Sequence, residues 1–591
     1  MHAYEKPLTF LRDTPKYKIP FFQRSYVWKE DNWKELWEEL VSARTNSFLG
    51  SIILKRTSIN GKELKLVIDG QQRLTTLSIL TKCLMDHLEK TAGTSTINSI
   101  LNELIFHTET IFTKGGFEEN RSPRIEHSRL DKMAFETVLY GTVDESNSHS
   151  IIQCYRFFEK QFAVASLDEV NHIVAKVAGS DSKLLVVIDL DENDDEQIIF
   201  DTINSAGVKL TAADIIKNAM YQKIDNGKPD TEEHYNEYWK KTFEQDQDTI
   251  DMWLETKGTG QNIKTYIDLF FHCFAIMRGF FDPTNDKIAE LADKYKAYIK
   301  NKSVQETKLF IEDICANAKK YKEIFIGYDS VTGYKYDQSK DRLLHILNTI
   351  KITIFDAYIL YVVSTYDENE CERRFKLLET YIIRNYVLGN SNTTKSYNQK
   401  MKEMLEERFV FEEELRAAER SDSCIEAKLK SMGNNPAKLV LFWIELYLRA
   451  TTTTSDQNET GLTYNYQLEH VMPQSWQENW AVVDCPVLCN GVPVADAEQA
   501  AEIRGHAIYE IGNMTLLTAK LNVQISNSSF KDKVEGREIK GKFAPGIRQN
   551  SSLRITVEDI VNQSEWNEDH ISARTKKITN LFKEMWPIPT E

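Results

Sequence analysis

The segment VIDGQQRLTTL, residues 67–77, is predicted to form a strand, a sharp turn and the start of a helix. Its apolar, β-branched beginning favours a strand, and Gly70 permits a sharp turn. The first N–H groups of the following helix are free to bind an anion, which the helix dipole also favours. Arg73 would clamp a phosphate with two parallel hydrogen bonds, while Asp69 would cap the helix or bind a metal or a nucleotide hydroxyl. The segment therefore predicts an α/β domain with an anion site.

The residues around this segment predict the rest of a mixed α/β domain. Residues 48–54 and 64–68 are short apolar runs joined across Asn60-Gly61, a strong hairpin-turn pair, and residues 184–190 predict a third strand. A helix is expected to begin near Asp31, which is a candidate N-cap. The apolar face of this helix would carry Trp33, Trp37 and Leu40.

The chain of 591 residues is longer than one hydrophobic core supports, so an α+β multidomain fold is expected. Residues 265–280 and 343–365 have helical periodicity with few Gly or Pro residues, and the polar run 451–459 predicts a linker. The predicted domains are residues 1–225, which are mixed α/β, residues 226–455, which are all helical, and residues 456–591, which combine short strands and helices.

The composition restricts the class of protein. The formal net charge of −16 argues against a protein that coats nucleic acid indiscriminately, because nonspecific DNA binding depends on Lys and Arg at phosphates. A local basic groove remains compatible with this charge. We expect no membrane partner and a cytoplasmic location, since there is no run of about 20 apolar residues and no signal-peptide core. The eight scattered cysteines suit a reducing compartment.

Two segments near the C-terminal end combine residues suited to phosphodiester hydrolysis. QLEHVMP, residues 467–473, places the carboxylate of Glu469 beside the imidazole of His470, and NMTLLTAKLN, residues 513–522, begins and ends with asparagine. A histidine can deprotonate water, and carboxylate and amide oxygens are suitable Mg²⁺ ligands. A lone histidine is more often structural and asparagines are common in turns, so the interpretation depends on the spacing of the whole set.

This spacing resembles that of HNH (ββα-metal) nucleases, in which an acidic residue or a histidine precedes the catalytic histidine and a proline, here Pro473, follows three places later. The stretch from the central asparagine to the last metal ligand has the length of residues 513–522. The positions of two zinc-binding cysteines in many HNH proteins hold Thr518 and Leu521, so no structural zinc is expected. The resemblance implies His470 as general base, Asn513 as the residue that orients it, and Glu469 and Asn522 as ligands of Mg²⁺ or Mn²⁺.

Residues 526–533, SNSSFKDK, resemble the tail of the C-terminal nuclease domain of GmrSD-type restriction enzymes. The resemblance implies contacts to DNA phosphates from Asn527, Lys531 and Lys533, although a solvated surface lysine would look the same. That branch ends with a tryptophan, an arginine and a second tryptophan. Trp566, Arg574 and Trp586 fit, as would a helix that packs aromatic residues. The long gap between His470 and Asn513 predicts an insertion at residues 477–505.

The N-terminal part resembles the N-terminal domain of the same family and, more broadly, the ParB/sulfiredoxin-like fold, whose Asp-Gly-x-x-Arg turn binds nucleotide phosphates. The segments that carry the resemblance are residues 23–28, 69–73 and 200–218. Aromatic core packing and a helix-turn-helix joint, with Gly207 as C-cap and Thr211 as N-cap, would explain part of the pattern. The resemblance implies a site for a nucleoside triphosphate (ATP, GTP or another) formed by Gln23, Arg24, Asp69, Gly70, Gln71, Gln72, Arg73, Asn204, Lys217 and Asn218.

Together these resemblances imply a nucleotide-regulated, Mg²⁺-dependent DNA endonuclease of the modification-dependent (type IV) restriction kind, which acts on double-stranded, modified phage DNA. An HNH site cuts one strand at a time, so a double-strand break favours a homodimer. One alternative is an HNH nuclease or toxin that ignores modification and cuts unmodified plasmid. Another is a noncatalytic, nucleotide-dependent DNA-binding regulator, whose function would survive His470→Ala.

Overall fold

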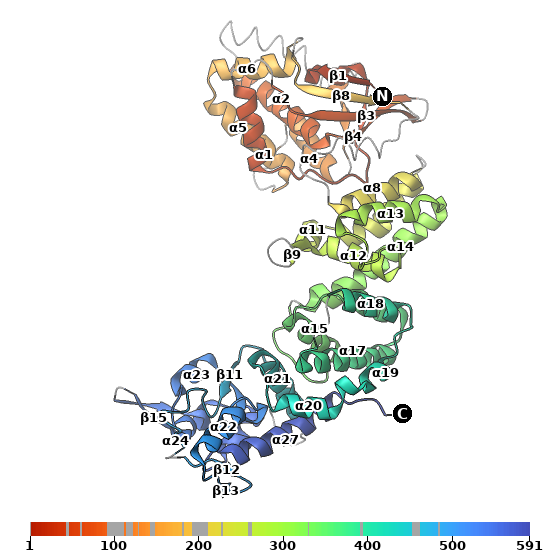
Figure 1. Cartoon of the computed structure of the whole chain (residues 1–591). Helices are drawn as coiled ribbons and strands as arrows, with labels where there is room; N and C mark the ends of the chain where they lie inside the picture. The colour runs from red at the N-terminus through yellow and green to blue at the C-terminus, as the bar shows by residue number, and fades with distance from the viewer. Residues whose placement is uncertain are drawn as a thin grey trace. The chain divides into compact units, whose positions relative to one another are not determined.

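The computed structural model divides into two compact units, which are described separately (Figure 1). The first contains residues 1–268 and 289–313, and the second contains residues 269–288 and 314–591. The structure describes residues 2–42, 47–59, 62–91, 111–113, 122–127, 129–141, 143, 148–179, 182–191, 211–225, 229–257, 263–328, 330–390, 394–451, 461–482, 485–539 and 541–590.

A mixed sheet forms the centre of the N-terminal part of the first unit. Its strand order is β1-β8-β3-β4-β2-β7, with parallel pairing of β3 with β8 and of β2 with both β4 and β7. The strands are β1 His2–Lys6, β2 Tyr17–Lys18, β3 Ser51–Ile59, β4 Lys62–Asp69, β7 Ile125–Glu126 and β8 Leu185–Leu190. The predicted strands at 64–68 and 184–190 are confirmed to within two residues at each end, whereas the strand predicted at 48–54 begins at Ser51 and continues to Ile59. The turn at Asn60-Gly61 is outside the described residues.

Helices cover one face of this sheet (Figure 1). Inward-facing residues such as Leu54, Val67 and Val187 belong to the same buried cluster as Leu77 and Phe158 of the helices. The other face carries a smaller cluster around Ile53 and Ile188. The helices are α1 Glu30–Val41, α2 Gln71–Thr91, α4 Arg129–Tyr140, α5 Ser150–Val164 and α6 Leu167–Ala178.

The N-cap of α1 is Lys29, two residues before the predicted Asp31. Asp31 is not the N-cap, because the Asn32 side chain accepts a hydrogen bond from the Lys29 main-chain N–H at 3.1 Å and closes the turn earlier. Asp31 lies in the first turn, where a negative charge suits the helix dipole. Trp33, Trp37 and Leu40 are buried, as predicted.

The remainder of the first unit is mostly helical. Thr211 caps α8 by accepting a hydrogen bond from the Asp214 N–H at 3.1 Å, which confirms the predicted N-cap. The short strands β9 Thr256–Lys257 and β10 Lys264–Thr265 pair with each other, so the expectation of a purely helical middle is wrong in this detail. The helices are α8 Ala212–Ile224, α9 Pro229–His234, η4 Tyr235–Lys240, α10 Lys241–Phe243, α11 Gln247–Leu254, η6 Ile288–Glu290 and α13 Leu291–Lys300, with parts of α12 Tyr266–Met277 and α14 Val304–Tyr321.

The second unit begins with a group of packed helices. The stretch 343–365 is helical as its periodicity predicts, and it forms parts of two helices. The break contains Lys351, whose φ of 59° is incompatible with continuing a right-handed helix. The helices are η7 Lys322–Ile326, α15 Ser339–Thr349, α16 Asp356–Thr365, α17 Glu368–Leu388, α18 Thr394–Leu405, α19 Phe411–Arg416, η8 Ala418–Arg420, α20 Asp422–Leu429 and α21 Asn434–Thr451.

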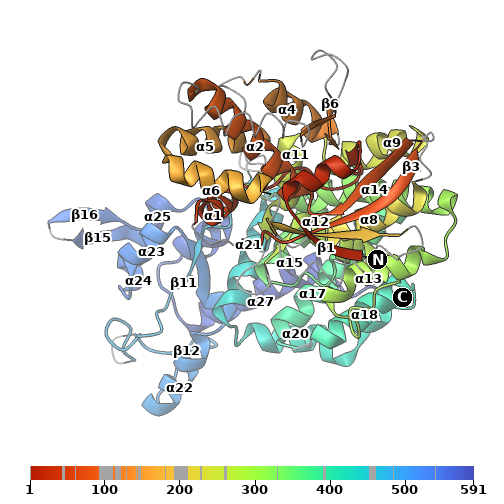
Figure 2. The same ribbon diagram turned by 90° about the horizontal axis from the view of Figure 1, so that it is seen from above.

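The C-terminal part of the second unit is built on a pair of antiparallel strands followed by a helix. The first strand and the helix are labelled β11 and α23 in Figure 2. These elements are β11 Gln467–His470, β14 Met514–Leu517 and α23 Ala519–Ile525. Between the two strands, the chain forms the hairpin β12 Leu488–Cys489 and β13 Val492–Pro493, α22 Ala497–Ala507 and η9 Ile511–Asn513. The remaining elements are α24 Phe530–Glu535, β15 Gly536–Ile539, β16 Lys542–Pro545, α25 Ile547–Asn550, α26 Arg554–Thr556, η10 Val557–Val561 and α27 Glu568–Met585.

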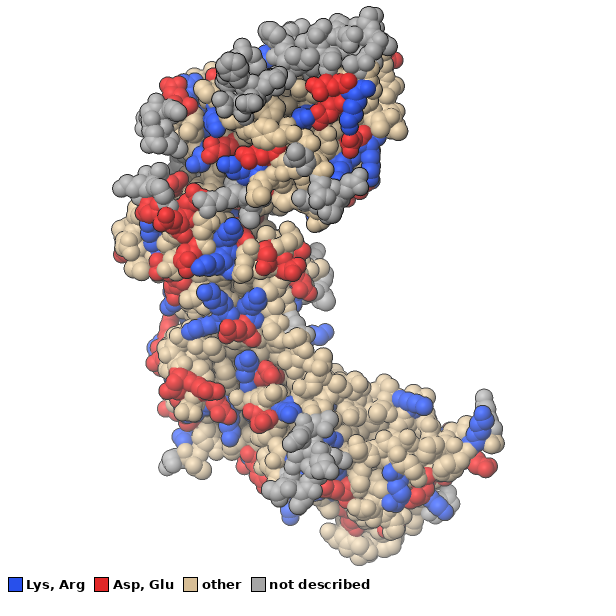
Figure 3. Space-filling model, turned by 180° about the vertical axis from the view of Figure 1, so that it is seen from behind, with Lys and Arg blue, Asp and Glu red and all other residues tan. Residues whose placement is uncertain are grey.

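Two properties hold for the described residues as a whole. None of the described helices has the length and apolarity needed to cross a bilayer. On the face drawn in Figure 3, basic and acidic side chains are interspersed among the coloured residues.

Candidate functional site

Strands β11 and β14 and helix α23 bring the C-terminal candidate residues together. The strands pair with His470 opposite Met514 and with Gln467 opposite Leu517. Asn522 of α23 donates a hydrogen bond from Nδ2 to Oε1 of Gln467 at 3.1 Å. Because alternate residues of a strand share a face, Glu469 is on the same side of β11 as Gln467. Asn522 and Glu469 therefore border one side of the strand pair.

Glu469 forms an ion pair with Lys533 of α24. The Lys533 side chain is 0% exposed and that of Glu469 is 14% exposed, and Nζ of Lys533 also lies 3.0 Å from the main-chain oxygen of His470. Burial raises the pKa of Glu469 and lowers that of Lys533, while their mutual attraction opposes both shifts. The prediction that Lys533 contacts DNA phosphate is wrong for this structure, because its ammonium group is buried against Glu469.

His470 lies at the end of β11 with its ring half-buried. Its Nε2 atom is buried and has no hydrogen-bond partner among the described residues. Burial lowers the pKa of His470 to about 4, and the positive charge of Lys533 acts in the same direction. The imidazole is therefore neutral at neutral pH and able to accept a proton.

Asn513 is completely buried, and both polar atoms of its side-chain amide are hydrogen-bonded to neighbouring groups. Its Oδ1 accepts from the Met472 N–H at 2.8 Å and from the Trp566 indole at 3.1 Å. Its Nδ2 donates to the main-chain oxygens of Met472 at 2.9 Å and Ile508 at 3.1 Å. The expectation that this amide holds the His470 ring is wrong, because no capacity remains for it. Asn513 instead positions the backbone that follows the histidine.

Arg574 and Gly512 hold the same turn in place. Buried Arg574 donates to the main-chain oxygens of Gly512 at 2.7 Å and Met514 at 2.6 Å. A Cβ atom at Gly512 would collide with the main-chain oxygen of Ile571 on α27. Gly512 is thus required by close approach of two backbones. Trp566 and Arg574 both support Asn513 and its neighbours, whereas Trp586 donates to Glu379 elsewhere in the unit.

The donor atoms on this side of β11 suit a hard divalent cation. Oδ1 of Asn522 is buried without a hydrogen-bond partner among the described residues, and the Glu469 carboxylate is on the same side. Among those residues, no group of three or more His, Cys, Asp or Glu side chains forms a metal cluster. One carboxylate and one amide oxygen are still enough for Mg²⁺, which usually keeps several waters.

In the first unit, hydrogen bonds from glutamine side chains connect residues 23–28 to β4 and to the start of α2. Nε2 of Gln23 donates to the Val67 oxygen at 2.7 Å, and Nε2 of Gln71 donates to the Arg24 oxygen at 3.1 Å. Gln72 donates to the Ser25 oxygen at 3.1 Å. The Oε1 atoms of Gln23 and Gln71 are buried without a hydrogen-bond partner among the described residues.

Charged residues surround the same turn. Gly70 has a φ of 88°, as the predicted sharp turn requires, and Arg73 donates to the Ser51 oxygen at 3.2 Å. Burial lowers the pKa of Arg24, and the negative charges of Asp214 and Asp69 oppose this shift. Burial raises the pKa of Asp69. The hydrogen bond from the Gly70 N–H and the positive charges of Arg73 and Arg24 oppose this shift. The turn therefore holds two arginines close to a buried carboxylate.

Two models of a protein family match the chain. The model described as GmrSD restriction endonuclease, N-terminal domain, matches residues 8–221, and the model described as GmrSD restriction endonucleases, C-terminal domain, matches residues 412–581. The chain belongs to the GmrSD restriction endonuclease family. It is thus a restriction-type endonuclease whose substrate is DNA. No curated protein matches the chain.

Helix α8, in the segment matched by the GmrSD N-terminal model, carries two of the predicted nucleotide-binding residues, Lys217 and Asn218, and they differ in their surroundings. Lys217 is 2% exposed and forms an ion pair with Glu244 at 2.8 Å, so it is not available to a nucleotide in this structure. Asn218 has a buried Oδ1 without a hydrogen-bond partner among the described residues. Asn204 is outside the described residues. Asp214, which sequence reasoning did not assign to the site, is the acidic residue of α8 that acts on Arg24.

A second residue that sequence reasoning missed is Asp131 of α4. Its Oδ2 accepts a hydrogen bond from the Tyr26 N–H at 2.8 Å, which supports the GmrSD segment 23–28. Burial raises the pKa of Asp131 to about 7. The sequence contains no local signal for this contact, because 105 positions separate the two residues.

Proposed function

We propose that this GmrSD-family chain is a nucleotide-regulated, Mg²⁺- or Mn²⁺-dependent DNA endonuclease with an HNH-type site, and that it restricts modified phage DNA. The strand–strand–helix order of β11, β14 and α23 supports the HNH assignment. The observation that carries the proposal is the buried, unpartnered Nε2 of His470 at the end of β11, directly after Glu469, whose carboxylate is on the same side of the strand as Asn522.

In the proposed reaction His470 accepts a proton from the water that attacks the scissile phosphate. Its low pKa keeps the imidazole neutral at physiological pH, which is the form that can act as a base. Asn513 acts as a positioning residue, because its side-chain amide forms hydrogen bonds with both the N–H and the carbonyl oxygen of Met472. Lys531 and Asn527 are exposed and are proposed to contact DNA phosphates.

The proposed cation ligands are Glu469 and Asn522. The unpartnered Oδ1 of Asn522 supports this assignment, since a buried acceptor without a donor is costly. A bound Mg²⁺ would offset the negative charge that develops on the phosphate. Lys533 already supplies one positive charge to Glu469, so the carboxylate would be shared between the ammonium group and the cation.

The proposed nucleotide site is the turn around Gly70 in a ParB/sulfiredoxin-like domain. Arg24 and Arg73 provide positive charge for phosphates, and the first N–H groups of α2 provide donors. The unpartnered oxygens of Gln23, Gln71 and Asn218 would accept hydrogen bonds from a ligand. Nucleotide bound here is proposed to regulate cleavage.

The test compares wild type with His470→Ala on modified phage DNA and on unmodified plasmid, with Mg²⁺ and each nucleoside triphosphate in turn. His506→Ala is the matched control, because His506 is exposed on α22. Loss of a general base typically costs about 10²–10⁴ in rate. We expect that loss for His470→Ala only, with nucleotide-dependent cutting of modified DNA.

Each other outcome contradicts a definite part of the proposal. Equal cutting of unmodified plasmid would replace modification-dependent restriction with a modification-insensitive nuclease. If His470→Ala cleaves DNA as fast as wild type, the HNH assignment is wrong. If nucleotide does not change the cleavage rate, the proposed regulatory role is wrong. A double-strand break further requires a second copy of the site, so sedimentation of the DNA complex should show a dimer.

A further inference from the structure

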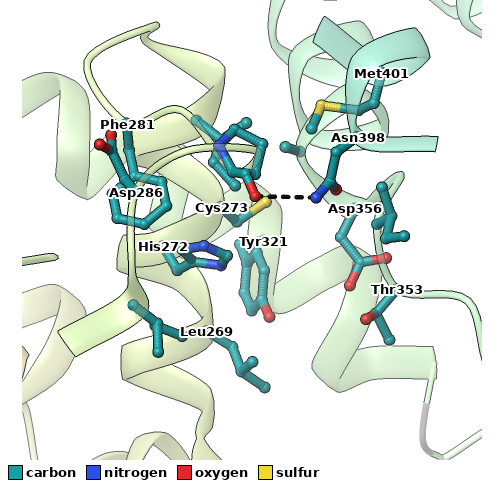
Figure 4. Close-up of a pocket in the computed structure, with 15 residues that line it drawn as sticks. Leu269, His272, Cys273, Phe281, Asp286, Tyr321, Thr353, Asp356, Asn398 and Met401 are labelled. Atoms are coloured by element: carbon teal, nitrogen blue, oxygen red, sulfur yellow. Dashed lines mark hydrogen bonds between the residues drawn. The ribbon is translucent and has the colours of Figure 1, made fainter. Parts of the chain in front are cut away.

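A cavity of about 310 Å³ lies among the helices of the second unit, outside the segments matched by the GmrSD models (Figure 4). Side chains from α12, the turn after it, the end of α14, the start of α16 and α18 line the cavity. All of the lining residues are within the same compact unit. The volume is at the lower end of the range for small-molecule sites, about 300–1,000 Å³.

The lining is acidic. It contains the carboxylates of Asp286 and Asp356 but no lysine or arginine. Figure 4 shows these carboxylates on opposite sides of the cavity. A low-dielectric wall strengthens the field of each carboxylate, so the cavity attracts a cation and repels a phosphate. This charge distinguishes it from the turn at Gly70, where arginines predominate.

The walls between the carboxylates are aromatic and aliphatic. The rings of His272 and Phe281 meet edge to face with centroids 4.9 Å apart, and Tyr321 lies between α12 and α16 (Figure 4). Aromatic faces attract ammonium groups, and the apolar side chains Ile276 and Met401 suit a short hydrocarbon chain. The walls thus fit a ligand that is cationic at its ends and apolar between them.

The cavity is also held open by contacts at its edge. Nδ2 of Asn398 donates to the Pro283 oxygen at 3.0 Å, and Lys402 forms an ion pair with Asp282 at 3.0 Å. Both contacts tie α18 to the turn after α12, and a preformed site loses little free energy to ordering on binding. Asp356 also lies in the first turn of α16, where a carboxylate interacts favourably with the helix dipole, and Oδ2 of Asp286 accepts a hydrogen bond from the Asp282 N–H at 2.8 Å. Neither role accounts for the open volume of the cavity.

We propose that this cavity binds a small organic amine, and that a short diamine with one ammonium group at each carboxylate fits it best. The proposal does not depend on the proposed nuclease or nucleotide chemistry. It assigns to the middle of the chain a ligand site of opposite charge preference to the sites for DNA and nucleotide.

The test measures binding of 1,4-diaminobutane to the full-length chain by isothermal titration calorimetry. Butylammonium, 1-butanol and inorganic phosphate are the comparison ligands. We expect the diamine to bind at least tenfold more tightly than butylammonium, with no binding of butanol or phosphate. Asp356→Asn and Asp286→Asn should each weaken diamine binding about tenfold or more, because each loses one charged hydrogen-bond acceptor.

Asp337→Asn is the matched control, because Asp337 is exposed in the same unit and does not line the cavity. It should leave diamine binding within twofold of wild type. Circular dichroism on every variant separates loss of the ligand site from loss of the fold. The proposal is overturned if folded wild type does not bind the diamine, if butanol binds equally, or if Asp337→Asn weakens binding as much as the cavity variants.

Discussion

Lys533 and Glu469 form an ion pair from which water is almost excluded, with 0% and 14% of the respective side chains exposed. The ammonium group also contacts the main-chain oxygen of His470 at 3.0 Å. One buried positive charge therefore stabilises both the proposed metal ligand and the backbone of the proposed general base. A divalent cation that uses Glu469 has to share its carboxylate with this lysine.

Removing that lysine should have opposite effects on stability and on cation binding. In metal-free protein, Lys533→Met leaves a largely buried carboxylate unpaired, and we expect a loss of about 3 kcal/mol in the free energy of unfolding. Adding Glu469→Gln should restore most of the loss. Chemical denaturation measures both effects, and equal stability of the single and double variants would contradict the coupling. Mn²⁺ should bind Lys533→Met more tightly than wild type, because a repelling charge is gone, and calorimetry tests this.

Asn513 and Asn522 should separate into a structural and a functional residue. Asn513→Ala leaves the buried Met472 and Trp566 N–H groups without an acceptor, which should cost about 2–5 kcal/mol of stability. Asn522→Ala loses only the partly exposed hydrogen bond to Gln467, so stability should change by less than about 1 kcal/mol while DNA cleavage falls. Thermal unfolding and cleavage rates measure the two effects. If Asn522→Ala still cleaves DNA as wild type does, the assignment of Asn522 as a metal ligand is wrong.

Arg73→Gln should weaken nucleoside triphosphate binding about tenfold or more, because it removes a charged donor at the start of α2. Arg56→Gln provides the control, since Arg56 is exposed on β3 of the same sheet. Calorimetric titration with ATP and GTP measures both variants. Equal weakening by the two substitutions would indicate only a general charge effect.

Asp131 should make the stability of the first unit depend on pH. Its folded-state pKa is about 7, whereas an unfolded aspartate titrates near 3.9. Because the folded-state value is raised, its contribution is fully present below about pH 4 and is lost as the pH rises through about 7. Asp131→Asn, which can still accept from the Tyr26 N–H, should match wild type near pH 4 and exceed it by up to about 4 kcal/mol near pH 8.

The neighbouring histidine moderates this effect, since Nε2 of His149 lies 3.5 Å from Oδ1 of Asp131 and favours the charged carboxylate when protonated. Denaturant unfolding across pH 4–8 measures the difference between the proteins. Asp168→Asn is the control, because Asp168 is exposed in the first turn of α6. A parallel pH dependence in wild type and Asp131→Asn would show that another group is responsible.

Local pattern alone predicted a large part of the architecture. The apolar runs placed β3, β4 and β8, and Thr211 was correctly predicted as the N-cap of α8. Alternation and helical periodicity depend on neighbours within a few residues, so they can be read without the fold. The split of the stretch 343–365 was missed, because the left-handed residue Lys351 has no turn-forming signature.

The sequence itself determined which side chains stand at the proposed sites and which family the chain belongs to. Only the tertiary structure decided which of these side chains are free to act. Lys531 is exposed while Lys533, two positions later, is buried against Glu469, which is 64 positions away. Lys217 and Asn513 are likewise committed to partners in other elements. Burial of a polar group depends on segments distant in the chain, because only their packing removes water and supplies the partner that offsets its loss.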